Sequence, residues 1–217
     1  MAANDDWVSA RGGLLPMEFP YGNFRKNYYK LTTSAVAVYL GQPMDLDTNG
    51  QAIPATVSTA GTAFMVGPVV GFADSNMNAL PSAMLRVDAG PYIPASTDAY
   101  VLIADDPDQA FVMQVGTNGT TLSITTASMV KTGTFMYRSS SGSTTTGYCT
   151  AEFDPLSIST TGSGNIQIMG LIPLKNSDGS TNFVANSSGT AAGQWAKIRC
   201  RINGHRWTSD FPGNHVV

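Results

Sequence analysis

The hydrophobic pattern from Thr32 onward consists of short apolar runs separated by clusters of Gly, Pro, Asn, Asp and Ser. Short runs between turn-forming residues are typical of β-strands, whereas an amphipathic helix needs a longer periodic stretch. We therefore predict strands over 34–41, 62–73, 84–90, 99–104, 110–115, 121–126, 149–154, 165–173 and 195–204. Only short stretches around 74–84 or 126–130 suit a helix.

Alternation is clearest near the end of the chain, where Lys197, Arg199 and Arg201 separate small and apolar residues over 196–202. A period of two places the apolar side chains on one face of a strand and the basic side chains on the other. Many short strands joined by turns predict an all-β body over residues 31–217, built as an antiparallel β-barrel or β-sandwich. The pattern leaves the choice between barrel and sandwich open.

Residues 1–30 show neither helical nor alternating periodicity, and Pro and Gly residues interrupt any regular element there. The segment is nevertheless rich in aromatic residues, which a flexible tail does not need. We predict an extended N-terminal arm whose aromatic residues anchor it to a partner, the alternative being an irregular segment packed on its own domain. The predicted contact residues of the arm are Trp7, Phe19, Tyr21, Phe24, Arg25, Lys26, Tyr28, Tyr29 and Lys30.

Charge is scarce and unevenly distributed along the chain. Hydrophobic residues make up 42% of the sequence and charged residues only 12%, a profile more common in secreted or particle-bound β-proteins than in cytosolic enzymes. Residues 31–192 contain four basic and eleven acidic residues, whereas residues 193–217 contain four basic and one acidic. This asymmetry predicts that the basic ends contact something acidic, such as the acidic body of a neighbouring copy.

The basic face of residues 195–206 has three interpretations. It is a solvated strand face, a charged contact surface for a partner, or a nucleic-acid face bracketed by Trp195 and Trp207. The basic residues are too sparse for nucleic-acid binding. We therefore take Arg199, Arg201 and Arg206 as a second candidate partner surface and expect no nucleic-acid partner.

Three aspartates, Asp105, Asp106 and Asp108, interrupt the apolar stretch 100–115. Asp followed by Pro107 is typical of a tight turn between two strands, and carboxylates at a hairpin tip point into water. A general acid–base pair would need one carboxylate in an apolar pocket. We predict a hairpin turn and no enzyme, with a hydrolase using these aspartates as the rival hypothesis.

The segment "DLDTNGQ" (45–51) matches the first half of a calcium-binding loop through Asp45, Asp47, Asn49 and Gly50. The twelfth position is Thr56 instead of Glu, and the flanking residues do not predict helices. A hairpin tip explains the same residues. His205, His215 and the two cysteines lack zinc-ligand spacing, so we expect no metal and no cofactor.

Cys149 and Cys200 either form one disulfide or remain two buried thiols. The first thirteen residues lack the apolar core of a signal peptide, and no apolar run is long enough for a membrane helix, so we expect no membrane partner. The Ser/Thr/Gly-rich stretches 138–147 and 175–193 predict surface loops.

Three segments together resemble a group of small structural proteins encoded in tailed-phage genomes. They are, in order, "VYLGQPMDLDTNGQ" (38–51), "YVLIADDPDQAFVMQV" (100–115) and "AKIRCRINGHRW" (196–207). None of these motifs is catalytic or ligand-coordinating. The resemblance implies a cement protein of the virion, assembled in the host cytoplasm, that decorates and stabilises the phage capsid by bridging subunits of the major capsid protein. It also implies a homo-oligomer, such as a trimer. The alternative is a tail or host-recognition module whose loops bind surface glycans.

Overall fold

The computed structural model describes residues 12–17, 25–32, 36–57, 64–80, 92–116, 123–124, 128, 130–159, 164–175, 181–182, 185–186 and 197–207. Every named strand pair in these ranges is antiparallel. The described helical structure includes one bounded 3-10 turn, η2 (Pro155–Ser157). The all-β prediction is therefore confirmed.

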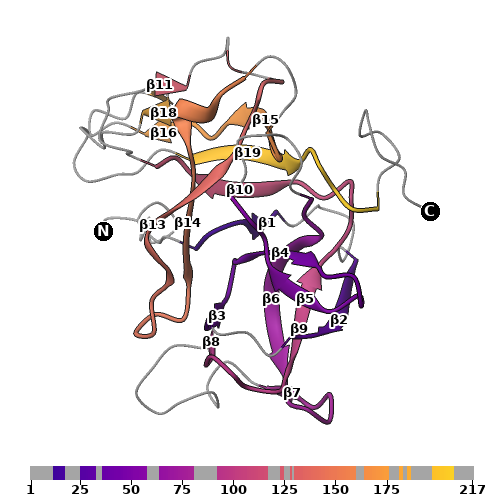
Figure 1. Ribbon diagram of the computed structural model, residues 1–217. Coiled ribbons are helices and arrows are strands. Elements are labelled where there is room, and N and C mark those ends of the chain that lie inside the picture. Colours follow the sequence, from indigo (N-terminus) through magenta and orange to yellow (C-terminus); the bar gives the residue numbers. More distant parts are fainter. Residues whose placement is uncertain are drawn as a thin grey trace.

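Two larger sheets organise the molecule, and their strands run across one another (Figure 1). The five-stranded sheet has the order β1 (Leu15–Pro16), β10 (Phe111–Gln114), β19 (Lys197–Ile202), β15 (Ile166–Leu171) and β12 (Thr132–Gly133). The six-stranded sheet has the order β2 (Lys26–Lys30), β9 (Tyr100–Ala104), β6 (Gly67–Ala73), β4 (Pro43–Leu46) and β5 (Ala52–Pro54), with β7 (Ala79–Leu80) paired to β6.

Four two-stranded pairs complete the described strands. They are β3 (Val38–Tyr39) with β8 (Tyr92–Ile93), β13 (Phe135–Gly142) with β14 (Cys149–Phe153), β11 (Ser123–Ile124) with β18 (Ala185–Asn186), and β16 (Leu174–Lys175) with β17 (Thr181–Asn182). The expected loop over 138–147 is corrected here, because strand β13 extends through Gly142. Residues 74–80 likewise form a turn and β7 instead of a helix.

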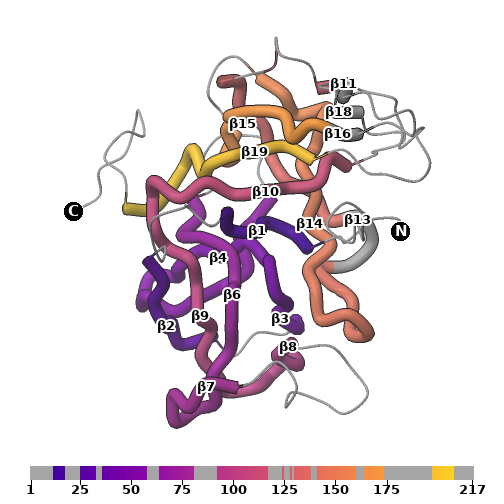
Figure 2. Tube along the Cα trace, turned by 180° about the vertical axis from the view of Figure 1, so that it is seen from behind, coloured from indigo at the N-terminus to yellow at the C-terminus, as the bar shows by residue number. Residues whose placement is uncertain are grey.

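The six-stranded sheet curls around its own core, because an isolated bridge connects its two outer strands, and a second bridge connects the five-stranded sheet to the β13–β14 pair. Leu31, directly after β2, bridges to Ala52 of β5, and Val115, directly after β10, bridges to Phe153 of β14. One cluster of buried apolar residues includes Phe111, Phe135 and Phe153. A second cluster lies inside the six-stranded sheet, and Figure 2 shows the two groups of strands one above the other from behind.

The apolar face of the five-stranded sheet explains why both cysteines are buried. Ile198, Cys200 and Ile202 of β19 all point into the larger core, as the period-two pattern predicted. Cys149 of β14 lies in the same core, and both residues are free thiols. Burial raises the pKa of the Cys149 thiol to about 12, so both residues serve as core side chains.

The N-terminal residues that the structure describes belong to these sheets. Leu15–Pro16 pairs with β10, and Lys26–Lys30 pairs with β9 along its full length. Leu14 is fully buried in the larger core. Over 12–17 and 25–30 the chain is therefore not the extended arm that its glycines, prolines and aromatics predicted. Residues 1–11 and 18–24 lie outside the described ranges, so the arm stays a prediction there.

Gly41 allows the N-terminal segment to approach the body at backbone distance. Its φ is +74°, a Cβ at this position would overlap the Gly12 carbonyl oxygen, and its own carbonyl accepts the Leu14 N–H at 2.9 Å. We expect Gly41→Ala to lower the free energy of unfolding by at least about 3 kcal/mol through strain and steric overlap.

Gly50 provides the matched control for this substitution. Its φ is +72°, but its hypothetical Cβ has no heavy atom within 4 Å. Gly50→Ala should therefore cost only about 1 kcal/mol, the strain of a left-handed conformation alone. Urea denaturation measures both losses, and equal losses for the two variants would contradict the close approach at Gly41.

Candidate functional site

The turn after β9 carries the chain from the six-stranded sheet into the five-stranded sheet. Strands β9 and β10 lie in different sheets, so the predicted hairpin over 100–115 is corrected to a crossover. The turn itself is confirmed: the Asp106 carboxylate accepts the Asp108 N–H at 3.0 Å, and the Asp106 carbonyl accepts the Gln109 N–H at 3.1 Å. The first aspartate of the group behaves differently.

Asp105 is buried, with 1% of its surface exposed, instead of pointing into water as predicted. Its carboxylate accepts hydrogen bonds from Arg25 Nε at 3.1 Å, Asn27 Nδ2 at 2.8 Å and the Tyr29 hydroxyl at 2.6 Å. Arg25 Nη2 also donates to the Asp105 carbonyl oxygen at 2.6 Å. These side chains come from β2 and the residue before it, so this polar network fixes β2 on the crossover.

The environment of Asp105 favours a permanent carboxylate. Burial alone would raise the pKa of Asp105, but the hydrogen bonds from Tyr29, Asn27 and Arg25 outweigh it and hold the pKa below its ordinary value. A general base needs an available lone pair directed at a substrate, and a general acid needs a raised pKa. This geometry makes Asp105 a structural anion.

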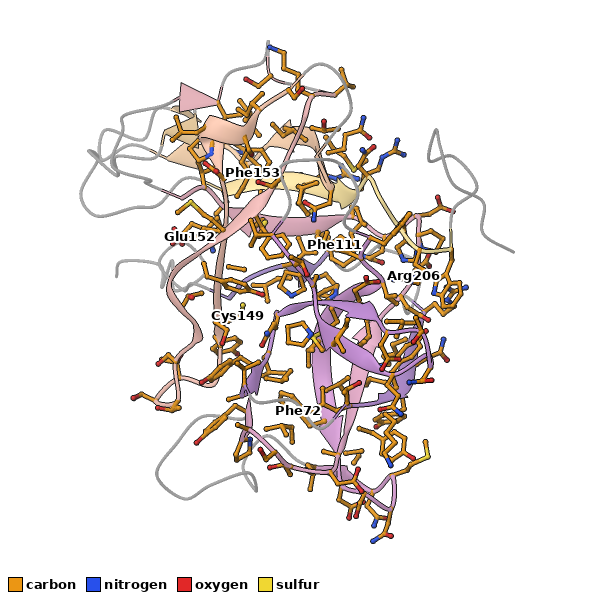
Figure 3. All side chains as sticks on the ribbon, viewed as in Figure 1. Phe72, Phe111, Cys149, Glu152, Phe153 and Arg206 are labelled. Atoms are coloured by element: carbon orange, nitrogen blue, oxygen red, sulfur yellow. The ribbon has the colours of Figure 1, made fainter. Side chains whose placement is uncertain are left out.

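The residues that follow β19 pack near the same crossover turn. His205 is fully buried and forms a β-bridge with Met65. Its Nδ1 accepts the backbone N–H of Trp207 at 3.1 Å, and burial lowers the pKa of His205. Arg206 donates two hydrogen bonds of 2.7 Å each to the Asp45 carboxylate and a third, at 2.9 Å, to the Leu46 carbonyl. Figure 3 shows Arg206 on the opposite side of the molecule from Glu152.

The pairing of Arg206 with Asp45 corrects one expectation, and the neighbouring strand pairing confirms another. Arg206 is not free for a partner, because this bidentate contact binds the segment after β19 to β4. The hairpin interpretation of residues 45–51 is confirmed: β4 and β5 pair, and the Asp47 carboxylate accepts the Asn49 and Gln51 N–H groups, each at 2.8 Å. Both aspartates thus have structural partners.

Trp207 packs near the crossover turn through its contact with Tyr29 and keeps 51% of its surface exposed. Its indole N–H neighbours the Tyr29 hydroxyl and acts to lower the pKa of Tyr29, although burial and Asp105 together raise that pKa to about 12. We name the five residues Arg25, Asn27, Tyr29, Asp105 and Trp207 the junction cluster. Two members of the cluster are solvent-accessible: Trp207, which contacts Tyr29, and Arg25, whose side chain is 50% exposed.

The exposure of the basic side chains of β19 increases along the strand. Lys197 is buried, Arg199 is partly buried and Arg201 is exposed, so the predicted basic face holds only toward the end of the strand. Arg201 Nε donates to Gln167 Oε1 on the neighbouring strand β15. Met169 is the bulge residue of β15 and is 41% exposed.

The other predicted contact residues are dispersed. Lys30 forms an ion pair of 3.5 Å with Asp98, and Lys26 and Tyr28 lie on β2 beside it. Trp7, Phe19, Tyr21 and Phe24 lie outside the described residues. Of the predicted set, Arg25 and Tyr29 enter the junction cluster.

Sequence reasoning missed a second buried carboxylate, Glu152. It is fully buried on β14 and accepts a hydrogen bond from Gln114 Nε2 of β10 at 2.9 Å. Glu152 lies between Ala151 and Phe153 in the sequence, so a period-two pattern places it on the face opposite these apolar residues. That pattern predicts an exposed side chain and gives no signal of its burial. In the part of the chain that the structure describes, no group of three or more His, Cys, Asp or Glu residues could hold a metal. Among the same residues, no helix has the length and apolarity to cross a membrane.

These features define the class of protein: an antiparallel all-β chain with two core clusters, joined at a polar junction that exposes a tryptophan. Comparisons with protein families, with curated proteins and with solved structures gave no match.

Proposed function

We propose that this protein is a structural component of a tailed-phage virion that decorates the capsid and stabilises it by bridging major capsid protein subunits. Support comes from the three phage-like segments and from the all-β body with few charged residues. A decoration protein gains affinity from repeated contacts on a lattice, so each contact can be modest in area. Under this proposal the protein is not an enzyme.

The observation that carries the proposal is the exposure of Trp207 on a rigid base. Tryptophan and arginine dominate the binding energy of protein interfaces, and positioned side chains lose little entropy on binding. Trp207 is 51% exposed, and the Arg25 side chain of the same cluster is 50% exposed. We take this part of the junction cluster as the capsid contact, and predict that Trp7, Phe19, Tyr21 and Phe24 add to it.

Trp207→Ala tests this contact by cosedimentation with capsids that lack the protein. We expect affinity to fall by at least about tenfold per site, the effect of removing one interface hot spot. Leu156→Ala is the matched control, because Leu156 is 53% exposed and lies on η2, away from the junction cluster. Equal binding by wild type and Trp207→Ala would overturn the proposed contact.

A tail or host-recognition module is the second candidate function. An exposed tryptophan in one cluster with Arg25 and Asn27 is also suited to a sugar ring, which stacks on an aromatic face and accepts hydrogen bonds from planar polar groups. Binding of the purified protein to host cells, lost in Trp207→Ala, would favour this function. Binding to capsids and not to cells favours decoration.

A further inference from the structure

The basic residues of the described chain differ in whether a carboxylate neutralises them. Arg25, Lys30 and Arg206 form ion pairs with Asp105, Asp98 and Asp45, respectively. Arg201 instead donates to the neutral amide of Gln167. Within the described ranges, Arg199 and Arg201 form no ion pair; Arg201 is exposed, whereas Arg199 is partly buried and its Nε is inaccessible to solvent.

Charge also separates along the chain. Residues 25–108, which include the six-stranded sheet, contain four basic and eight acidic residues, a balance of −4. Residues 109–207, which contain most of the five-stranded sheet, have seven basic and three acidic residues, a balance of +4. Figure 1 shows β7 and β15 at opposite ends of the molecule, and Arg201 of β19 pairs with Gln167 of β15.

The acidic end is built by two chain segments that meet beside β7. Ala73 of β6 pairs with Tyr100 of β9, which places Asp74 and Asp98 at the same end of the sheet. Asp98 keeps 59% of its side chain exposed despite its pair with Lys30. The hydrogen bond from the Asn78 side chain has the largest effect and lowers the pKa of Asp74. Hydrogen bonds from the backbone N–H groups of Asn76 and Asn78 lower that pKa further and keep Asp74 ionised.

The basic end has an apolar component. Val130 is 76% exposed and has a φ of +60°, a strained conformation for a β-branched residue. Its N–H donates to the Ile168 carbonyl at 2.9 Å, and its carbonyl accepts from Gln167 Nε2 at 3.2 Å. Gln167 in turn accepts from Arg201, so these residues form one connected surface. We define the β15 face as Val130, Gln167, Met169, Arg199 and Arg201.

We propose that the β15 face binds the acidic end of a second copy of this chain, around Asp74 and Asp98. Charge complementarity selects this occupant: the face presents unpaired arginines around exposed apolar side chains, and the chain itself carries an acidic surface at its other end. The contact is head to tail, so it closes into a ring or continues as a chain of copies. It does not depend on the proposed capsid role.

Two neutralising variants of equal net charge test the contact in purified protein. Arg201→Gln removes a positive charge from the β15 face, whereas Lys30→Gln removes the cation that partly neutralises Asp98. In sedimentation velocity at about 0.02 M salt, where screening is weak, we expect association about two- to fivefold weaker for the first variant and about two- to fivefold tighter for the second. Shifts in the same direction would overturn the proposal, because net charge alone would then explain them.

A mixing experiment tests the head-to-tail geometry. Arg199→Ala with Arg201→Ala inactivates the basic end without adding a negative charge and leaves the acidic end intact, and Asp98→Lys inactivates the acidic end and leaves the basic end intact. Each variant alone should remain near the monomer mass of 22.8 kDa, and their mixture should form one-to-one dimers and nothing larger. Failure of the mixture to associate, or association of either variant alone at the wild-type level, contradicts the contact.

Val130→Gly separates binding from folding. The substitution removes an exposed side chain and relieves its strained φ, so the melting temperature should stay equal or rise while association weakens severalfold. Unchanged association would exclude Val130 from the interface. Wild-type protein that is monomeric at low salt and at concentrations of about 0.1 mM would contradict the whole proposal.

Discussion

Deleting residues 1–30 should unfold the protein, whereas deleting residues 1–11 should leave it folded. The longer deletion removes Leu14, which is fully buried, and all of β2 with its pairing to β9. It also leaves the Asp105 carboxylate buried without the three side chains that donate to it. We expect a combined loss of more than about 5 kcal/mol, comparable with the whole stability of a typical domain.

Far-UV circular dichroism and urea denaturation measure this difference. The shorter deletion removes Trp7 but none of the contacts described here, so its unfolding midpoint should match wild type. It is therefore the variant that tests whether an N-terminal arm contributes to capsid binding. Cooperative unfolding of the longer deletion at the wild-type midpoint would contradict the assignment of β2 to the body.

Asp105→Asn should lower the free energy of unfolding by about 2–3 kcal/mol, the loss expected when a buried, charge-assisted hydrogen-bond network is broken. The new amide places a donor against the donors of Arg25, Asn27 and Tyr29. We discount the Arg25 ion pair in this estimate because its side chain is half exposed and screened by solvent. Asp108→Asn, at an exposed position of the same turn, should cost less than about 0.5 kcal/mol.

The pH dependence of stability gives Asp105 a signature of its own. Because its pKa is lower in the folded protein than in the unfolded chain, its contribution is present above the unfolded value of about 4 and is lost as pH falls toward the folded value. Wild-type stability should therefore decline below about pH 4 more steeply than that of Asp105→Asn. Parallel curves for the two proteins would show that Asp105 is not held as a carboxylate.

Local patterns predicted β6, β9, β10, β14, β15 and β19, because burial on one face of a strand leaves a period-two record, but they missed β2, β4, β5 and β13. In β19 the residues Ile198, Cys200 and Ile202 are buried as the alternation predicted, and the turns at Asp106 and Asp47 follow from their own side chains. The same local reasoning overestimated the exposure of Lys197, which is buried. Its exposure depends on which residues pack over the beginning of β19.

The junction cluster was not predictable, because its members are distant in sequence. Asp105 is 76 residues from Tyr29 and 80 residues from Arg25. Nothing in the sequence near Asp105 indicates donors that reach it from β2. The aromatic residues Tyr28 and Tyr29 suggested an arm, but tyrosine is also a strong β-former. Asn27 and Tyr29 are two residues apart on β2, so both side chains point to the same face and donate to Asp105 in the crossover.

Copy number on purified virions tests the central claim most directly. Quantitative mass spectrometry of particles purified from a host that expresses this protein gives its ratio to the major capsid protein. The decoration role predicts hundreds of copies for each particle, in a fixed ratio to the capsid subunits. A dozen copies or fewer, or absence from the particle, would contradict it.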